Sequence, residues 1–145
     1  MKRILILTVM LFALSALSAC AGAKALPAAD AAAFAAQVDP LVDNLLLSIN
    51  NNDHAGYIRD MDEKMKAASD APAFANLTQL LSNKIGKYVS RRMTQVIESG
   101  KYRTIIYSAK FEGEDDVRVQ VSFSLDGPQP LISGLWFNSP KLRAK

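Results

Sequence analysis

Cysteine and histidine are scarce in this sequence, and each scarcity excludes a class of function. Cys20 is the only cysteine and His54 the only histidine among 145 residues. A single cysteine cannot form an intrachain disulfide, and a single histidine cannot build a histidine-rich metal site. We therefore expect no metal and no cofactor, and a fold that depends on its hydrophobic core.

A large excess of charge is also lacking. The chain has 17 basic and 14 acidic residues, which gives a net charge of +3 at pH 7. Lys2 and Arg3 belong to the leader described next, and removing them leaves 15 basic residues against 14 acidic ones. This near balance gives no electrostatic basis for binding nucleic acid, so we expect no nucleic-acid partner.

The start of the chain has the pattern of an export signal. Lys2 and Arg3 precede a largely apolar run over residues 4–14, and small residues lead from there to Cys20. The run is too short to span a bilayer, and no stop-transfer pattern follows it. Leu17-Ser18-Ala19-Cys20 resembles the lipobox of bacterial lipoproteins, in which acyl chains such as palmitate anchor the cysteine to a membrane.

The lipobox resemblance implies a location in the cell envelope. Residues 1–19 are then a signal peptide, and Cys20 is the lipidated first residue of the mature protein. Two or three acyl chains anchor a protein stably, because each buried methylene contributes about 0.8 kcal/mol. Ala21, where an aspartate is absent, implies the periplasmic face of the outer membrane in a cell with two membranes. An ordinary secretory signal, cut after Ala23 or Ala25, is the alternative.

Beyond the leader the composition predicts one domain. Residues 20–29 comprise the lipidated cysteine and a tether of small residues, residues 30–140 form the domain, and residues 141–145 are a polar, frayed tail. Asp30 is the expected N-cap of a first helix, and Asp39-Pro40 renews its start signal. Apolar side chains then recur at helical spacing over residues 41–49.

Two more helices and four strands are predicted after residue 50. Asp53 caps a helix that ends near residue 68, and Asp70 opens another that ends at Gly86. The strands are expected over residues 87–98, 102–111, 117–125 and 131–137. The third strand shows the clearest pattern, because apolar and polar side chains alternate along it. Gly134 predicts a bulge in the last strand.

This order of elements predicts an α+β fold, with N-terminal helices packed on a curved four-stranded antiparallel sheet. Its motifs are Asn51-Asn52-Asp53, residues 61–66, Ile85-Gly86-Lys87-Tyr88, and a last strand that ends in Gly134-Leu135-Trp136. With them the chain resembles, over roughly residues 39–138, the bacterial domain-of-unknown-function family numbered 3887. That family is similar in fold to the nuclear-transport-factor-2-like (cystatin-like) superfamily of α+β cones.

The resemblance implies a cone with a pocket at its open end, but it implies no reaction. Isomerases, dehydratases, binding modules and dimerisation domains all share the superfold. Aromatic and methionine side chains at periodic positions are candidates to line the pocket and to stack on an apolar or sugar-like ligand. They are Tyr57, Met61, Met65, Tyr88, Met93, Tyr107 and Trp136. The alternative is that these side chains belong to the core.

Charged residues offer weaker candidates. Asp53 and His54 form an acid/base pair or, as we favour, an exposed helix start. Asp60, Asp62 and Glu63 suggest a metal, but their spacing spreads them around a helix. An acidic turn over residues 112–116 lacks the spacing of a calcium loop. Basic residues near the first hairpin either meet anionic groups or protect an edge strand. They are Lys84, Lys87, Arg91, Arg92, Lys101 and Arg103.

We therefore expect a lipid-anchored envelope protein whose domain binds a small apolar ligand or a partner protein of the envelope, without catalysis. Two alternatives remain. One is an enzyme of the isomerase or hydrolase type that acts in the pocket. The other is a structural module that forms a homodimer through its sheet.

Overall fold

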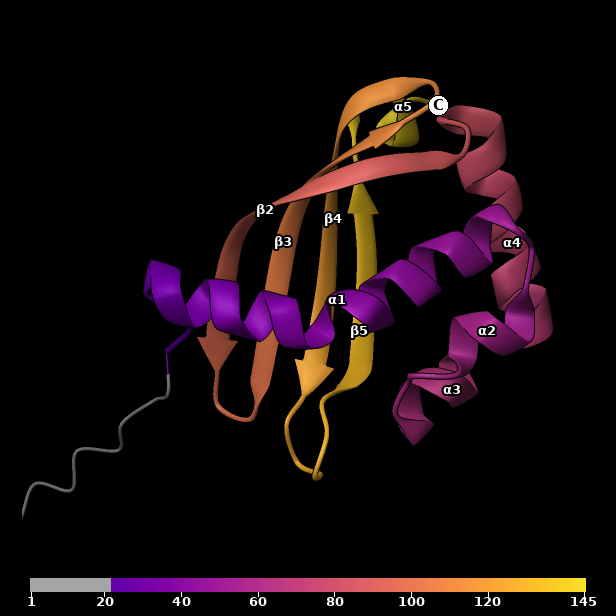
Figure 1. The fold of residues 1–145 in the computed structure, drawn as a ribbon. Coiled ribbons are helices and arrows are strands. Elements are labelled where there is room, and N and C mark those ends of the chain that lie inside the picture. Colours follow the sequence, from indigo (N-terminus) through magenta and orange to yellow (C-terminus); the bar gives the residue numbers. More distant parts are fainter. Residues whose placement is uncertain (1–21) are drawn as a thin grey trace, which may run out of the picture.

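The structure is a computed structural model that describes residues 22–145, so Cys20 and the leader lie outside the described residues. The helices are α1 (Ala28–Asn50), α2 (His54–Ile58), α3 (Glu63–Ala68), α4 (Ala71–Lys84) and α5 (Pro140–Arg143). The strands are β1 (Lys24–Ala25), β2 (Tyr88–Ser99), β3 (Tyr102–Phe111), β4 (Glu114–Ser124) and β5 (Leu131–Asn138). Helices pack against one open antiparallel sheet, as an α+β fold requires (Figure 1).

The sheet has five strands in the order β1-β2-β3-β4-β5, whereas the sequence predicted four. The additional strand is β1, which lies in the expected tether and pairs Lys24 with Glu98 and Ala25 with Ile97. The Leu26 N–H also donates to the Val96 carbonyl at 2.9 Å. Two residues are too few to show a period of two, so no sequence pattern indicates this strand.

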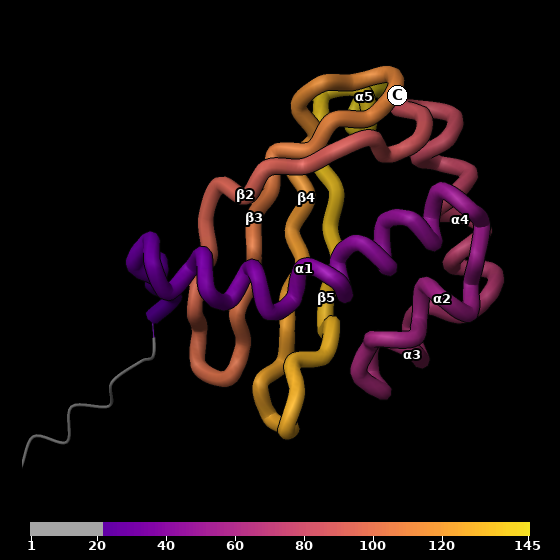
Figure 2. The backbone as a smooth tube through the Cα atoms, viewed as in Figure 1, coloured from indigo at the N-terminus to yellow at the C-terminus, as the bar shows by residue number. Residues whose placement is uncertain are grey.

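Helix α1 crosses one face of the sheet and is continuous through Pro40 (Figure 2). The expected restart at Asp39-Pro40 is therefore wrong. Proline removes one backbone hydrogen bond, but Val38 and Val42 on either side of it are fully buried on the same sheet. Packing of both halves on one face outweighs the lost bond. Among the described helices, α1 alone is long and apolar enough to cross a membrane, but its buried side chains make it the central core helix.

The predicted helix from Asp53 to residue 68 is broken into α2 and α3. The cause is an edge contact with β5: the Ile132 N–H donates to the Asp60 carbonyl, and the Asp62 N–H donates to the Ile132 carbonyl, both at 2.9 Å. Met61 between them is 1% exposed. Each short helix has its own cap, since Asp53 accepts from the Gly56 N–H and Asp62 from the Met65 N–H. Long-range pairing therefore overrides the helical periodicity.

Several other sequence predictions are confirmed. Asp70 caps α4, and Gly86 ends it with a φ of 78°. The side chains that alternate along β4 are buried on the α1 face. The pairing of β4 with β5 skips Ser133 next to Gly134, which is the expected bulge. The tail differs from the prediction, because the Ser139 hydroxyl caps α5 and Leu142 packs against the core.

Candidate functional site

Most of the charged candidates have structural roles. The His54 Nε2 lies 2.7 Å from the Ser69 carbonyl and its ring packs on Phe74, so His54 fixes the start of α2 beside the start of α4. Asp60 forms an ion pair with its neighbour Arg59. Among residues 22–145 no group of three or more His, Cys, Asp or Glu side chains is arranged to hold a metal ion.

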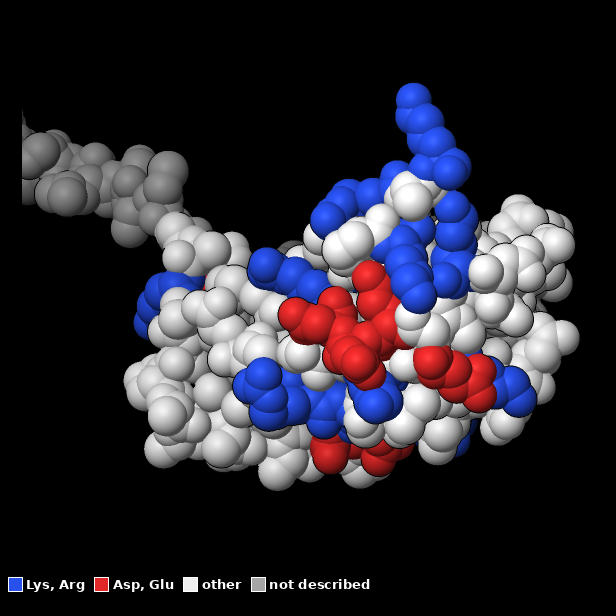
Figure 3. Space-filling view, turned by 90° about the horizontal axis from the view of Figure 1, so that it is seen from above, with Lys and Arg blue, Asp and Glu red and all other residues white. Residues whose placement is uncertain are grey.

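The basic residues do not form one patch either. Lys101 pairs with Asp126 and Arg103 with Glu98, while Lys84 donates to the carbonyl of Ala144. Seen from above, the molecule shows acidic side chains gathered at the centre of one face, with lysine and arginine side chains beside them (Figure 3). This face therefore has no single sign of charge.

The seven predicted pocket residues are distributed over several places. Tyr88, Met93 and Tyr107 line a hollow between α1 and strands β2 and β3. Tyr57 and Trp136 line a separate groove beside β5. Met65 lies in a third hollow next to α3, and Met61 is in the core. One common pocket is therefore not formed, but three of the seven residues meet at one site.

We call this site the Arg91 hollow, after the side chain at its centre. Its volume is about 480 Å³, which is within the range of small-molecule sites. Helix α1 contributes two alanines and, one turn apart, Asp39 and Asp43, and β2 and β3 contribute the rest. The lining consists of Ala35, Ala36, Asp39, Asp43, Tyr88, Val89, Ser90, Arg91, Met93 and Tyr107.

Arg91 joins the helix to the sheet. Its Nη1 donates to the Asp43 Oδ1 at 2.5 Å and to the Tyr88 hydroxyl at 3.0 Å, and its Nη2 donates to the carboxylate of Asp39. The guanidinium also lies 5.2 Å from the centre of the Tyr107 ring. The Arg91 side chain is 8% exposed, whereas those of Asp39 and Asp43 are 56% and 54% exposed. The two carboxylates therefore form the mouth of the hollow, and Arg91 forms its wall.

The start of β2 is fixed by a residue that sequence reasoning missed. The Asn50 side chain at the end of α1 donates to the Tyr88 carbonyl at 2.8 Å and accepts from the Tyr88 N–H at 2.9 Å. Tyr88 is also paired with Phe111 of β3, and the two bonds from Asn50 add to this pairing and set the position of Tyr88 above the hollow. Asn50 carried a helix-end signal in the sequence, but nothing there indicated this contact.

Burial and charge set the protonation of the site. Burial disfavours the charged guanidinium of Arg91, but hydrogen bonds to Asp43 and Asp39 outweigh burial and raise its pKa. Burial also raises the pKa of Tyr107 to about 12, and the nearby Arg91 cation limits this rise. At neutral pH Arg91 is therefore charged and the Tyr107 hydroxyl is neutral.

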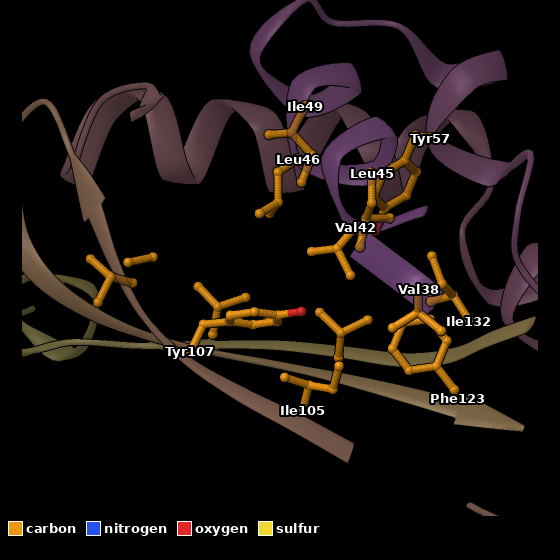
Figure 4. Close-up of a cluster of buried hydrophobic side chains, with 14 of the residues drawn as sticks. Val38, Val42, Leu45, Leu46, Ile49, Tyr57, Ile105, Tyr107, Phe123 and Ile132 are labelled. Atoms are coloured by element: carbon orange, nitrogen blue, oxygen red, sulfur yellow. The ribbon is translucent and has the colours of Figure 1, made fainter. Parts of the chain in front are cut away.

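Two buried polar atoms of the hollow lack a partner. Among residues 22–145 neither the Tyr107 hydroxyl nor the Arg91 Nε has a hydrogen-bond partner. Tyr107 lies on the sheet side of the core, facing the α1 side chains Val42 and Leu46 (Figure 4). Because an unpaired buried polar group costs about 1–3 kcal/mol, a group that pairs with these atoms would be stabilised there.

Comparison with protein families identifies the domain. Residues 43–128 match the model of a family described as protein of unknown function (DUF3887). The chain belongs to this family. The DUF3887 match includes Asp43, Asn50, Tyr88, Arg91 and Tyr107, so most of the Arg91 hollow lies in the part shared with the family. No curated protein and no solved structure matches this DUF3887 chain significantly.

Proposed function

We propose that this DUF3887 protein is lipid-anchored in the cell envelope through Cys20 and binds a small, neutral, hydroxyl-rich molecule in the Arg91 hollow, without catalysis. One observation carries the proposal: two buried polar atoms, the Tyr107 hydroxyl and the Arg91 Nε, are unpaired at the wall of a hollow large enough for a small molecule. The lipid anchor is supported by the sequence pattern that ends at Cys20.

The charges of the hollow favour a neutral ligand. Asp39 and Asp43 together carry one negative charge more than Arg91 neutralises, and both carboxylates lie at the mouth. An anion would be repelled there. The Arg91 Nε, a donor, and the Tyr107 hydroxyl, a donor or an acceptor, are buried behind the inner wall, and a ligand hydroxyl that displaces the covering side chains would pair with them.

The polar residues of the hollow change the ligand chemistry that we expect. The sequence predicted an apolar ligand, on the basis of Tyr88, Met93 and Tyr107. Arg91 and the two aspartates of α1 add polar groups to that lining, and the Tyr88 ring still offers an aromatic face. Aromatic faces beside hydrogen-bonding groups suit a sugar-like molecule, which has both apolar faces and hydroxyl edges.

The ionisable groups of the hollow are poorly placed for acid/base chemistry. Asp39 and Asp43 already accept hydrogen bonds from Arg91, so these carboxylate oxygens are engaged within the protein. The raised pKa of Tyr107 keeps its proton in place at neutral pH. These features support binding rather than proton transfer.

The fold is also proposed in finer terms as a nuclear-transport-factor-2-like cone. Support comes from α1, which crosses the concave side of the sheet, and from bulges that bend β2 after Tyr88 and after Met93. Strands bent in this way close the sheet over one end of the helix.

Thermal stabilisation by a panel of monosaccharides, disaccharides and polyols tests the proposal. The full chain, purified in detergent, should show a rise in melting temperature with at least one compound. Tyr107→Phe should weaken that compound's affinity about tenfold, because one hydrogen bond of about 1.4 kcal/mol is lost.

Tyr102→Phe is the matched control, since Tyr102 is 41% exposed and does not line the hollow. It should leave the affinity unchanged. The proposal is overturned if no compound stabilises the protein, or if Tyr107→Phe binds a stabilising compound as tightly as the unmodified chain does.

A further inference from the structure

A groove beside β5 is independent of the Arg91 hollow. We call it the β5–α4 groove; its volume is about 430 Å³, and it lies between the end of β5, one side of α4 and the short helix α5. Its lining is mainly apolar: Tyr57, Leu77, Leu80, Leu81, Leu135, Trp136, Phe137, Asn138, Leu142 and Arg143. Leu80 and Trp136 are 47% and 48% exposed, so two large apolar side chains at this groove face solvent.

The groove runs along an unprotected strand edge. β5 is the last strand of the sheet, and Ile132 alone among its residues forms backbone bonds on the outer side within the described chain. Among the described residues, no strand pairs with residues 134–138 on that side. Natural edge strands are usually short, charged or covered, because free backbone groups invite pairing with another chain. β5 has the sequence LISGLWFN, which contains no charged residue.

The other edge of the sheet carries charged residues, which β5 lacks. There β1 covers the end of β2, and Lys24 and Arg103 both pair with Glu98. β5 therefore lacks the charge that usually discourages pairing at a strand edge.

Three cations of α4 and α5 have no carboxylate partner among the described residues. The Arg143 Nη1 donates to the Asn138 side-chain oxygen, the Lys141 Nζ to the Gly113 carbonyl, and the Lys84 Nζ to the Ala144 carbonyl. None of the three forms a salt bridge within residues 22–145. Of the three, Arg143 lines the groove, so its positive charge is available to an acidic group that enters it.

We propose that the β5–α4 groove binds an extended segment of a partner protein, which adds a strand to the free edge of β5. The segment places the apolar side chains of one of its faces against Leu80 and Leu135, and a carboxylate beside Arg143. Main-chain pairing provides affinity and the pockets provide specificity, as in other cases of strand addition.

The shape of the groove favours a single segment over a second copy of this chain. Neighbouring strands lie about 4.7–4.9 Å apart, so a strand added to β5 would lie between β5 and α4. In a second copy β5 carries its own α4 on the same side. The two α4 helices would then collide before the two edges could pair.

Selection from a display library of random dodecapeptides on the full chain tests the proposal. The enriched peptides should share alternating apolar residues and an acidic residue. Leu80→Glu should weaken their binding at least tenfold, and so should Arg143→Glu. Leu47→Glu is the matched control, because Leu47 is 49% exposed but lies on α1 outside the groove. It should have no effect.

Hydrogen exchange with a bound peptide locates the contact. The amides of residues 134–138 should exchange more slowly, and a peptide with alternate N-methylated amides should not protect them. The proposal is overturned if the library gives no shared pattern, if binding is insensitive to Leu80→Glu, or if protection occurs elsewhere. Slow exchange of these amides without peptide, in a protein that sediments as a dimer, would show that a second copy occupies the edge.

Discussion

Replacing Tyr107 with phenylalanine should stabilise the protein when no ligand is bound. The substitution removes only the hydroxyl oxygen, which is buried and has no partner among the described residues, and it keeps a ring that is 3% exposed. An unpaired buried hydroxyl costs about 1–3 kcal/mol. Removing the hydroxyl leaves a cavity the size of one atom, and the lost packing there cancels part of the gain in stability. We expect a net increase of about 1 kcal/mol in the free energy of unfolding.

Thermal and urea unfolding at neutral pH measure this change. For a domain of this size an increase of about 1 kcal/mol raises the melting temperature by about 3–5 °C. Tyr102→Phe serves as control: its side chain is largely solvated, so the change should stay within about 0.5 kcal/mol. The reasoning is refuted if Tyr107→Phe lowers the melting temperature by a similar amount, since the hydroxyl would then have a stabilising partner in solution.

The other predictions concern charge, backbone and anchoring. Burial raises the pKa of Tyr107 from 10.0 to about 12. Ionisation of Tyr107 therefore leaves the free energy of unfolding unchanged below pH 10 and lowers it as the pH rises from 10 through 12. Between pH 10 and 12 the free energy of unfolding of the unmodified protein, measured with urea, should therefore fall by up to about 2 kcal/mol relative to that of Tyr107→Phe. Parallel pH profiles of the two proteins would contradict this. Arg91→Met should lower the free energy of unfolding by about 2 kcal/mol in the same assay, because it leaves Asp39 and Asp43 close together without a cation. The exposure of the two carboxylates limits this effect. An unchanged stability would show that the ion pairs contribute nothing. Gly86→Ala should cost about 1–2 kcal/mol, since φ is 78° and the new Cβ would lie 2.9 Å from the Glu112 Cβ, and a neutral result would mean that this turn rearranges freely. Cys20→Ser should abolish labelling by radioactive palmitate and release the protein from membranes, and unchanged membrane fractionation would contradict the anchor.

Local patterns account for the parts of the fold that the sequence predicted well. Alternation from Val117 to Phe123 located β4, and the pair of Asp70 and Gly86 located both ends of α4. Each of these signals is contained within a few residues. The break at Met61 and the strand at Lys24 depend instead on distant strands, β5 and β2, so no local pattern could reveal them.

The candidate site was predicted in part for the same reason. Aromatic and methionine content pointed to Tyr88, Met93 and Tyr107, which do meet in one hollow. Arg91 was grouped with surface cations, because its inward direction depends on the bulges that bend β2. Asp39 and Asp43 are spaced one helical turn apart, and this spacing was a signal that two carboxylates share a face.

The short strand β1 begins only a few residues after the cysteine that is proposed to carry the lipid. Four peptide links join Cys20 to Lys24, so a lipid on that cysteine would hold β1 within about 14 Å of its attachment point. β1 and β5 occupy opposite edges of the sheet. A lipid on Cys20 would thus keep the β1 border close to the bilayer, and the border that carries Trp136 lies across the whole width of the sheet from it.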